Sequence, residues 1–181
     1  MVANANCPIP NNINPLSPTG FRFSITKLPE VSFFCQEIAL PDINLPNIQV
    51  GTPLSMLNQP GEIITYGDLT LNFLVDEDMK NYKAVYNWLI GLGFPESHDQ
   101  YATFNADQQG SMGYQVRGAA LDFSDGTLDI LGSNNISVKT INFIDLIPVS
   151  LSSLQFTSMS TDVTYLTGSA TFKYTYYNFA T

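Results

Sequence analysis

The 181-residue sequence is poor in charge, and most of the charge that it carries is negative. Charged residues make up 13% of the chain, with 16 acids against 7 bases and a formal net charge of −9. Proteins that bind nucleic acids tightly use Lys and Arg to displace counterions from phosphates. The composition therefore excludes binding of DNA or RNA by charge attraction, but it does not exclude DNA that passes nearby without binding.

Signals for membranes and secretion are also missing. No run approaches the eighteen or more apolar residues of a membrane-spanning helix, and the start of the sequence has neither the basic nor the apolar region of a signal peptide. We expect a protein that is assembled in a cytoplasm and does not insert in a membrane. Cys7 and Cys35 could pair, but free thiols are favoured in a reducing compartment.

Residue types that build active sites are scarce. His98 is the single histidine, so no second one is present for a zinc site or a catalytic pair. The segment 122–129 superficially resembles a calcium loop, but Ser and Gly stand where ligands belong, and a hairpin turn at Asp125-Gly126 is favoured. Phosphate-binding and nucleophile-elbow motifs are absent. The sequence predicts no metal, no cofactor and no enzymatic activity.

What the sequence does contain is a folding composition, with 44% hydrophobic and 12% aromatic residues. Residues 1–19 hold four prolines and five asparagines without periodicity, which predicts an extended arm. Residues 20–181 are long enough for a single domain with its own core. Within this domain, 94–135 is rich in Gly, Asp, Gln and Ser, and we expect a loop-rich insertion there.

Alternating apolar and polar residues predict the strands. The alternation runs through 21–25 and 31–35, which we interpret as a hairpin, and through 69–75 and 169–178. The proline-rich stretch between 39 and 62 predicts a long extended loop with one short strand near Asn47–Val50, because proline is confined to sheet edges and bulges. Together these patterns predict a mainly β fold, an antiparallel barrel or sandwich with one packed helix.

The helix is predicted over 77–90, directly after the acidic triplet Asp76, Glu77 and Asp78. Three carboxylates could bind a hard cation, but no further ligands are apparent. We favour a helix joint, with Asp76 as the N-cap and the other two acids in the first turn, where the helix dipole favours negative charge. An apolar stripe predicts the packing face, with Trp88 at its edge. Its members are Tyr82, Val85, Tyr86, Trp88 and Leu89.

The strands carry few edge-protecting lysines, and an unguarded sheet edge recruits another strand. We predict that subunits join by backbone pairing along 68–75 and 169–178, while the arm and the proline-rich loop reach neighbours. The alternative is a monomeric β-barrel binding module with a tyrosine-rich ligand face at Tyr174, Tyr176 and Tyr177. The predicted assembly residues are Leu69, Leu71, Asn72, Phe73, Thr171, Phe172, Tyr174 and Tyr176.

Two segments resemble a known family. "VSFFCQEIALPDINLPNIQV" followed by "TYGDLTLNFLVDEDMKNYKAVYNWL" is similar to the tail tube proteins of contractile-tailed, T4-like bacteriophages. The C-terminal "INFIDLIPVSLSSLQF" and "GSATFKYTYY" are similar to the final strands of that family and of the related baseplate protein that initiates the tube. The matching positions are Phe34, Cys35, Ala39, Leu40, Pro41, Leu69, Leu71, Asp76, Glu77, Tyr82 and Trp88.

This resemblance implies a virion protein that forms a six-fold ring, with rings stacked into a tube that carries double-stranded DNA into the host. The implied partners are further copies of the chain, adjacent tube or baseplate rings, and a sheath protein. An acidic or neutral channel would not capture phosphates, so the DNA would slide through it without specific binding.

Overall fold

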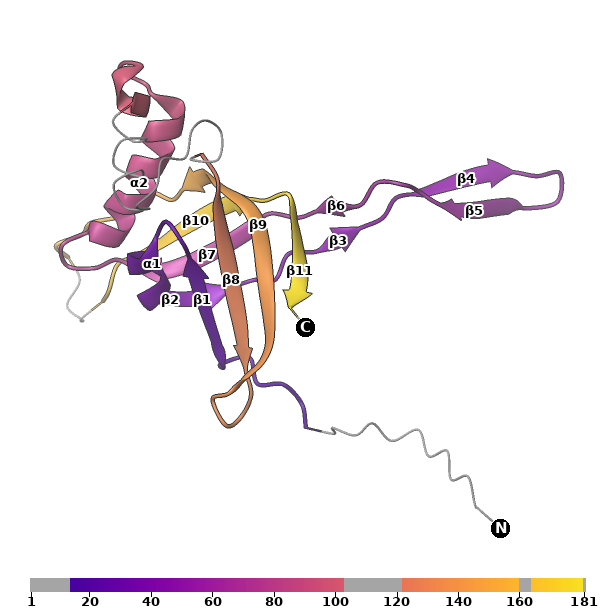
Figure 1. Cartoon of the computed structure of the whole chain (residues 1–181), viewed down its shortest axis with the longest axis horizontal. Helices are drawn as coiled ribbons and strands as arrows, with labels where there is room; N and C mark the ends of the chain where they lie inside the picture. Colours follow the sequence, from indigo (N-terminus) through magenta and orange to yellow (C-terminus); the bar gives the residue numbers. More distant parts are fainter. Residues whose placement is uncertain (1–13, 103–121, 160–163, 181) are drawn as a thin grey trace, which may run out of the picture.

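A computed structural model describes residues 14–102, 122–159 and 164–180, and its main feature is one seven-stranded antiparallel sheet (Figure 1). The strands follow the order β1-β8-β9-β10-β7-β2, and β11 also pairs with β9. The path is open, so the described strands form no closed barrel. Their bounds are β1 Phe21–Ile25, β2 Cys35–Ile38, β7 Leu69–Leu74, β8 Ser124–Leu131, β9 Ser137–Leu151, β10 Thr167–Lys173 and β11 Tyr176–Ala180.

Strand β9 belongs to both halves of the sheet. Its first part pairs with β8 and β11, and its last part pairs with β10. Between them, Asp145 has a φ of 59°, a left-handed conformation that Asp tolerates better than most residues. The Asp145 N–H lies 3.4 Å from Asp125 Oδ1, and its carboxylate accepts a 3.2 Å hydrogen bond from Thr175 Oγ1. Asp145 is thus the bend at which the chain passes from one half to the other, and the halves cross in Figure 1.

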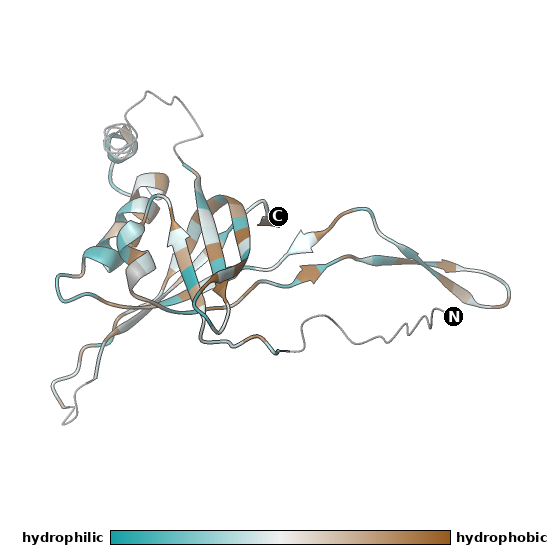
Figure 2. Ribbon diagram, turned by 60° about the horizontal axis from the view of Figure 1, so that its bottom comes forward, coloured by the Kyte–Doolittle hydropathy of each residue, from teal (hydrophilic) through white to brown (hydrophobic). Residues whose placement is uncertain are grey.

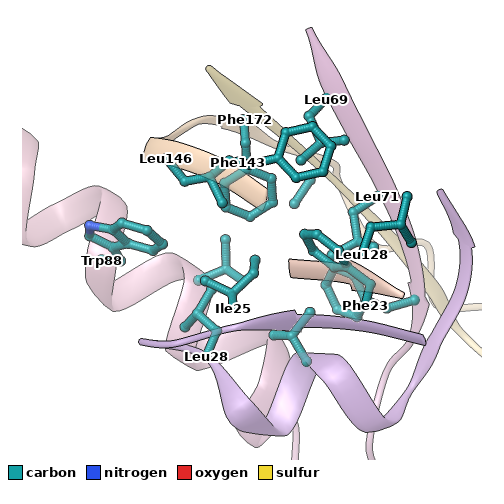
Figure 3. Close-up of a cluster of buried hydrophobic side chains, with 14 of the residues drawn as sticks. Phe23, Ile25, Leu28, Leu69, Leu71, Trp88, Leu128, Phe143, Leu146 and Phe172 are labelled. Carbon is teal, nitrogen blue, oxygen red and sulfur yellow. The ribbon is translucent and has the colours of Figure 1, made fainter. Parts of the chain in front are cut away.

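The core fills the space that this crossing encloses. The alternation in β7 is confirmed, since Leu69, Leu71 and Phe73 are fully buried. They meet Phe172 of β10 and Phe143 of β9 in one cluster (Figure 3). Full burial of one such side chain stabilises a fold by about 1.5–3 kcal/mol, so this cluster is the main source of stability.

The hairpin predicted over 21–35 is wrong. Residues Pro29–Phe33 form the short helix α1, and β1 pairs with β8 instead of β2. Pro29 suits the first helical position, because its missing N–H would have no partner there. Val31 is fully buried, so its apolar character serves helix packing and not a strand.

The loop-rich assignment of 94–135 is wrong for residues 124–131, and so is the turn at Asp125-Gly126, whereas 94–98 and 132–135 are irregular or turn. Strand β8 spans residues 124–131. The turn that leads to β9 lies at Gly132–Ile136, where the Gly132 N–H donates to the Ile136 carbonyl at 2.9 Å. Gly126 is buried within β8, and a Cβ atom at this position would press against Leu146 and Phe23. The glycine therefore marks close packing and not a turn.

The predicted strand 169–178 is two strands. The chain leaves the sheet at Tyr174 and Thr175, so β10 lies in one half and β11 in the other. Alternation alone could not predict this break, because the apolar and polar residues continue to alternate across it.

The main helix, α2, spans Lys80–Gly93, so the predicted start at residue 77 is three residues early. Its N-cap position is Met79, in a left-handed conformation and without a side-chain cap. The buried contact face also differs from the prediction. Val85 and Trp88 are buried, Tyr82 and Leu89 are half-buried, and Tyr86 is 50% exposed. Tyr86 is therefore not a packing residue. Trp88 belongs to the buried cluster and does not lie at the edge of the helix's packing face (Figure 3).

A buried asparagine makes the junction between β7 and α2. Asn81 is fully buried; its Nδ2 donates to the Leu74 carbonyl at 2.7 Å, and its Oδ1 accepts from the Asp76 N–H at 3.2 Å. The sequence patterns did not predict this role, because Asn81 is polar and is not a member of the predicted apolar stripe. A polar residue shortly after a strand end, at the start of an apolar helix, was the available signal.

A long two-stranded ribbon projects from the sheet between β2 and β7 (Figure 1). Near the body, β3 (Ile43–Asn44) pairs with β6 (Thr65–Tyr66). Further out, β4 (Asn47–Gly51) pairs with β5 (Met56–Pro60). The short strand predicted near Asn47–Val50 is confirmed, but its partner strand was missed.

The two faces of α2 give a stability test. We expect Trp88→Ala to lower the free energy of unfolding by about 3–5 kcal/mol, because it empties a buried aromatic site. Tyr86→Ala, two residues away on the exposed side, should change it by less than about 0.5 kcal/mol. Urea unfolding followed by circular dichroism measures both. Equal losses in the two variants would show that the helix face is assigned wrongly.

Candidate assembly site

The projecting ribbon is the most exposed apolar element of the described chain. Every residue from 42 to 65 is exposed except the half-buried Gly61. Apolar side chains are included, since Leu54 is 98% and Met56 65% exposed. Figure 2 shows hydrophobic segments along the ribbon and at its tip, far from the body. A two-stranded ribbon is marginally stable in water by itself, so these side chains call for a second surface.

An aromatic cluster anchors the base of the ribbon. The ring of Tyr66 in β6 lies 5.9 Å from that of Tyr174 and 5.5 Å from that of Tyr177, measured between centroids. The Tyr177 hydroxyl lies 3.4 Å from the Pro41 carbonyl on the opposite strand of the ribbon base. We call these three tyrosines the clasp. Through the clasp, the C-terminal strand holds both strands of the ribbon where they leave the body.

Polar contacts reinforce the clasp. The Gly67 N–H donates to the Asp42 carbonyl at 3.0 Å, which ties the two strands together. A Cβ at Gly67 would press on the Asp42 carboxylate, so a side chain there would force Asp42 to move. Lys173 forms an ion pair with Asp68. The ribbon therefore leaves the body in a direction fixed by β10, β11 and the turn between them.

The hydroxyl of Tyr174 is buried without a hydrogen-bond partner among the described residues. Burial, with smaller contributions from Tyr177 and Tyr66, raises the pKa of Tyr174 to about 12. The residue stays neutral at physiological pH and contributes its ring. A buried, unpaired hydroxyl costs about 1–3 kcal/mol, so the ring packing must outweigh that cost.

Most of the strand length predicted to join subunits has no free edge. Strand β10 pairs with β7 on one side and β9 on the other, and β7 pairs with β10 and β2. Leu69, Leu71, Phe73 and Phe172 face the core, and Thr171 lies opposite Thr70 within the subunit. Edge pairing through β7 and β10 is wrong, because their ladders are already filled, but the end of the predicted strand 169–178 lies in β11, which keeps one unpaired side. In the described sheet, β1, β2 and β11 pair on one side only.

The remaining predicted assembly residues fall in three places. Asn72 lies on the outer face of β7, where its Nδ2 donates to Glu37 Oε2 at 2.8 Å. Tyr174 belongs to the clasp, and Tyr176 is 43% exposed on β11. Asn72 and Ser169 help line a shallow polar groove of about 310 Å³ on the outer face of the sheet.

The acidic triplet lies at the joint between β7 and α2, but not in the predicted way. Asp76 precedes the helix by a turn, and its Oδ1 accepts from the Glu77 N–H at 2.9 Å. Glu77 and Asp78 are exposed before the first helical turn, and Asp78 pairs with Lys80 at 2.7 Å. Asp76 is therefore not the N-cap. No cluster of three or more His, Cys, Asp or Glu that could hold a metal is found in the described ranges.

Other reactive groups are held in packing roles. Burial raises the pKa of the Cys35 thiol to about 11, which makes it a poor nucleophile, while Cys7 lies outside the described residues. His98 stacks on Tyr101, with ring centroids 5.9 Å apart. Lys27 lies over the Trp88 ring at 5.1 Å, and burial lowers its pKa to about 8. None of the helices in the described ranges could cross a bilayer.

Comparisons with known proteins find similarity in sequence and in fold. The family model described as "phage tail tube protein" matches residues 8–180. The tail tube terminator protein of Enterobacteria phage T4 is 30% identical over 84 residues, which cover 43% of this chain and 48% of the terminator. The chain thus spans about half the length of this curated relative.

Solved structures share the fold along nearly the whole chain. The tube-terminating cap of the anti-feeding prophage has a TM-score of 0.65 and 17% identity, covering 98% of this chain and 99% of the cap. The sheath/tube terminator of an extracellular contractile injection system has a TM-score of 0.61 and 17% identity, covering 93% and 98%. A chain from the sheath-tube complex of such a system has a TM-score of 0.60 and 15% identity, covering 92% and 91%.

The clasp can be tested separately from assembly. Spin labels attached at Ser55→Cys on the ribbon tip and Lys139→Cys on the body report the distance between the two parts. We expect Tyr66→Ala to broaden the distribution of this distance, because the ribbon loses its aromatic anchor. Tyr66→Phe keeps the ring and should leave the distribution narrow. Both variants should keep the melting transition of the body. A narrow distribution in the Ala variant would show that the tyrosines do not aim the ribbon.

The acidic triplet gives a second test. We expect dialysis against a strong chelator to leave the melting temperature and the assembly state unchanged, because Asn81 and backbone hydrogen bonds make the joint. Light scattering and calorimetry before and after dialysis measure this. Loss of assembly that added Ca²⁺ or Mg²⁺ restores would establish a metal role.

Proposed function

Because the chain belongs to the phage tail tube protein family, we propose that it is a non-enzymatic structural subunit of a contractile phage tail, in the ring that terminates the tail tube. The placement at the end of the tube is supported by the likeness to the phage T4 terminator in sequence and to two terminating caps in fold. The ring would consist of six copies around a channel, as the resemblance to T4-like tube proteins implies.

The observation that carries a structural role is the exposed ribbon. An element with its apolar side chains in water and a fixed direction is built to contact another protein. The binding-module alternative loses support, because Tyr174 and Tyr177 pack against Tyr66 and are not available as a ligand face. The proposed partners are other copies, the adjacent tube ring and a sheath protein.

The outer face of β7 and β10 suits the wall of the channel. Thr70, Asn72, Ser169 and Thr171 alternate with the core residues of these strands and present neutral polar groups. Neutral hydroxyl and amide groups attract DNA phosphates weakly, and the net charge of −9 adds repulsion within about 8–10 Å. Double-stranded DNA would pass such a wall without binding.

The copy number per particle tests this proposal. Densitometry of purified virions, scaled to the capsid protein, should give about six copies, the number for one closed ring. Many tens of copies would place the chain along the repeating tube instead. Absence from tails, with a monomer at high concentration in light scattering, would contradict the structural role.

A further inference from the structure

The free side of β11 is the least protected of the three strand edges that the described sheet leaves open. Strand β1, at the opposite side of the same half (Figure 1), carries the charged Arg22, and the N–H of its last residue, Ile25, donates to Ser32 Oγ of α1 at 3.3 Å. Strand β2 carries Glu37 and an irregular register at this residue. Charges, bulges and covering elements stop an edge from pairing with a further strand. Residues 174–180, by contrast, contain no charge and no proline, and β11 keeps a regular register with β9.

The side chains of β11 show that the sheet is incomplete at this edge. Phe179 lies opposite Ile141, and Ile141 lies opposite Leu128, so the three belong to one row on the core face. Ile141 and Leu128 are buried, whereas the Phe179 ring at the end of the row is 57% exposed. On the other face, Asn178 lies opposite Asn142. A further strand would continue both rows, with an apolar or small residue beside Phe179 and a polar residue beside Asn178.

The N-terminal arm contains a segment of this composition, outside the described residues. Residues 3–7 alternate small apolar residues with amides, in the order Ala, Asn, Ala, Asn, Cys, and no charged residue precedes Arg22. Such an alternation is the side-chain period of a strand, with the alanines on one face and the asparagines on the other. Each copy carries a net charge of −9, so an uncharged segment approaches another copy with little electrostatic repulsion.

Length and direction favour a neighbouring copy over the arm's own body. The described chain begins at Asn14, beside the turn between β8 and β9, and β11 ends beside the start of β9 near the same turn. The arm would therefore meet its own β11 in parallel, whereas neighbouring strands of the described sheet pair antiparallel. Pro8 and Pro10 favour an extended chain, so residues 7–14 would span about 20 Å and carry the segment away from the body.

We propose that residues 3–7 of the arm pair, as an added strand, with the free edge of β11 in a second copy of this chain. Main-chain hydrogen bonds provide the affinity of such a contact, and the alternation of side chains determines which face of the arm covers Phe179. The contact deepens the ring function proposed above and rests on it. It joins different surfaces of two copies, as a head-to-tail ring requires.

Disulfide cross-linking in purified tails tests the pairing. In a background with Cys7→Ser and Cys35→Ser, the chain carries Asn178→Cys together with either Asn4→Cys or Asn6→Cys, whose side chains share one face of the added strand. Mild oxidation should link neighbouring copies, because each arm cysteine lies beside β11 of the next subunit. A non-reducing gel should then show a ladder of covalent oligomers.

Two matched controls fix the face and the edge. Ala5→Cys with Asn178→Cys moves the arm thiol to the other face. Ser24→Cys with Asn6→Cys moves the acceptor to β1, at the opposite end of the row of side chains that contains Asn178. Each control should give at least fivefold less ladder, and an equal yield in either would overturn the proposal.

The form of the product separates the remaining outcomes. An internal disulfide in single chains, without a ladder, would assign the arm to its own β11 and overturn the proposal. If the chain enters tails in single-ring amounts and no link forms, the pairing fails while the ring function stands. Absence of the wild-type chain from tails would contradict the ring function itself.

Charge substitution provides a second readout that needs no oxidation. Ala3→Asp with Ala5→Asp places carboxylates beside the Phe179 ring, which blocks edge pairing, and should reduce incorporation into tails at least tenfold. Complementation of a phage that lacks the gene measures this. Asn11→Asp with Asn12→Asp adds the same charge outside the pairing segment and should be incorporated normally, and circular dichroism should report the same folded spectrum for both chains. Normal incorporation of the first chain, or equal loss of both, would overturn the proposal.

Discussion

A two-stranded ribbon has no interior, and this constraint shapes the rest of the molecule. Its strands satisfy each other's backbone groups, but its side chains gain burial only from another surface. At the base, that surface is the clasp of Tyr66, Tyr174 and Tyr177. Further out, the described chain provides none. The order of the ribbon therefore depends on the body at one end and, in the proposed function, on another protein at the other.

The body is organised in a way that makes this anchor rigid. The bend at Asp145 lets β9 pair with β10 in one half of the sheet and with β11 in the other. The turn between β10 and β11 carries Tyr174 and is held to the bend through Thr175 and Asp145. The same arrangement that encloses the core thus positions the clasp. A change at the bend would be expected to alter the direction of the ribbon.

The sequence predicted the fold class, the core face of β7 and the existence of α2, because strong periodicities of two and 3.6 residues define them. It could not predict the start of α2, since Asn81 and not an acidic cap makes that joint. The sequence also led to the prediction that β7 and β10 have exposed edges that join subunits, whereas the two strands pair with each other within one subunit. Alternation shows that a strand has a buried face, but it holds no information on which neighbours fill its edges.

The ribbon was the hardest element to predict, because a sequence pattern does not show which surface a strand packs against. Its pattern contains prolines and apolar residues without a core to pack against, so it resembles an extended loop when only one chain is considered. The pairing register of β4 and β5 shows how the residues are arranged. Val50 lies opposite Leu57 on an aliphatic part of the ribbon, and Gln49 lies opposite Asn58 on a polar part. Such a pattern is expected of an element that packs against a second surface. A segment that cannot bury its apolar side chains within one chain is therefore consistent with a protein that completes its packing on assembly.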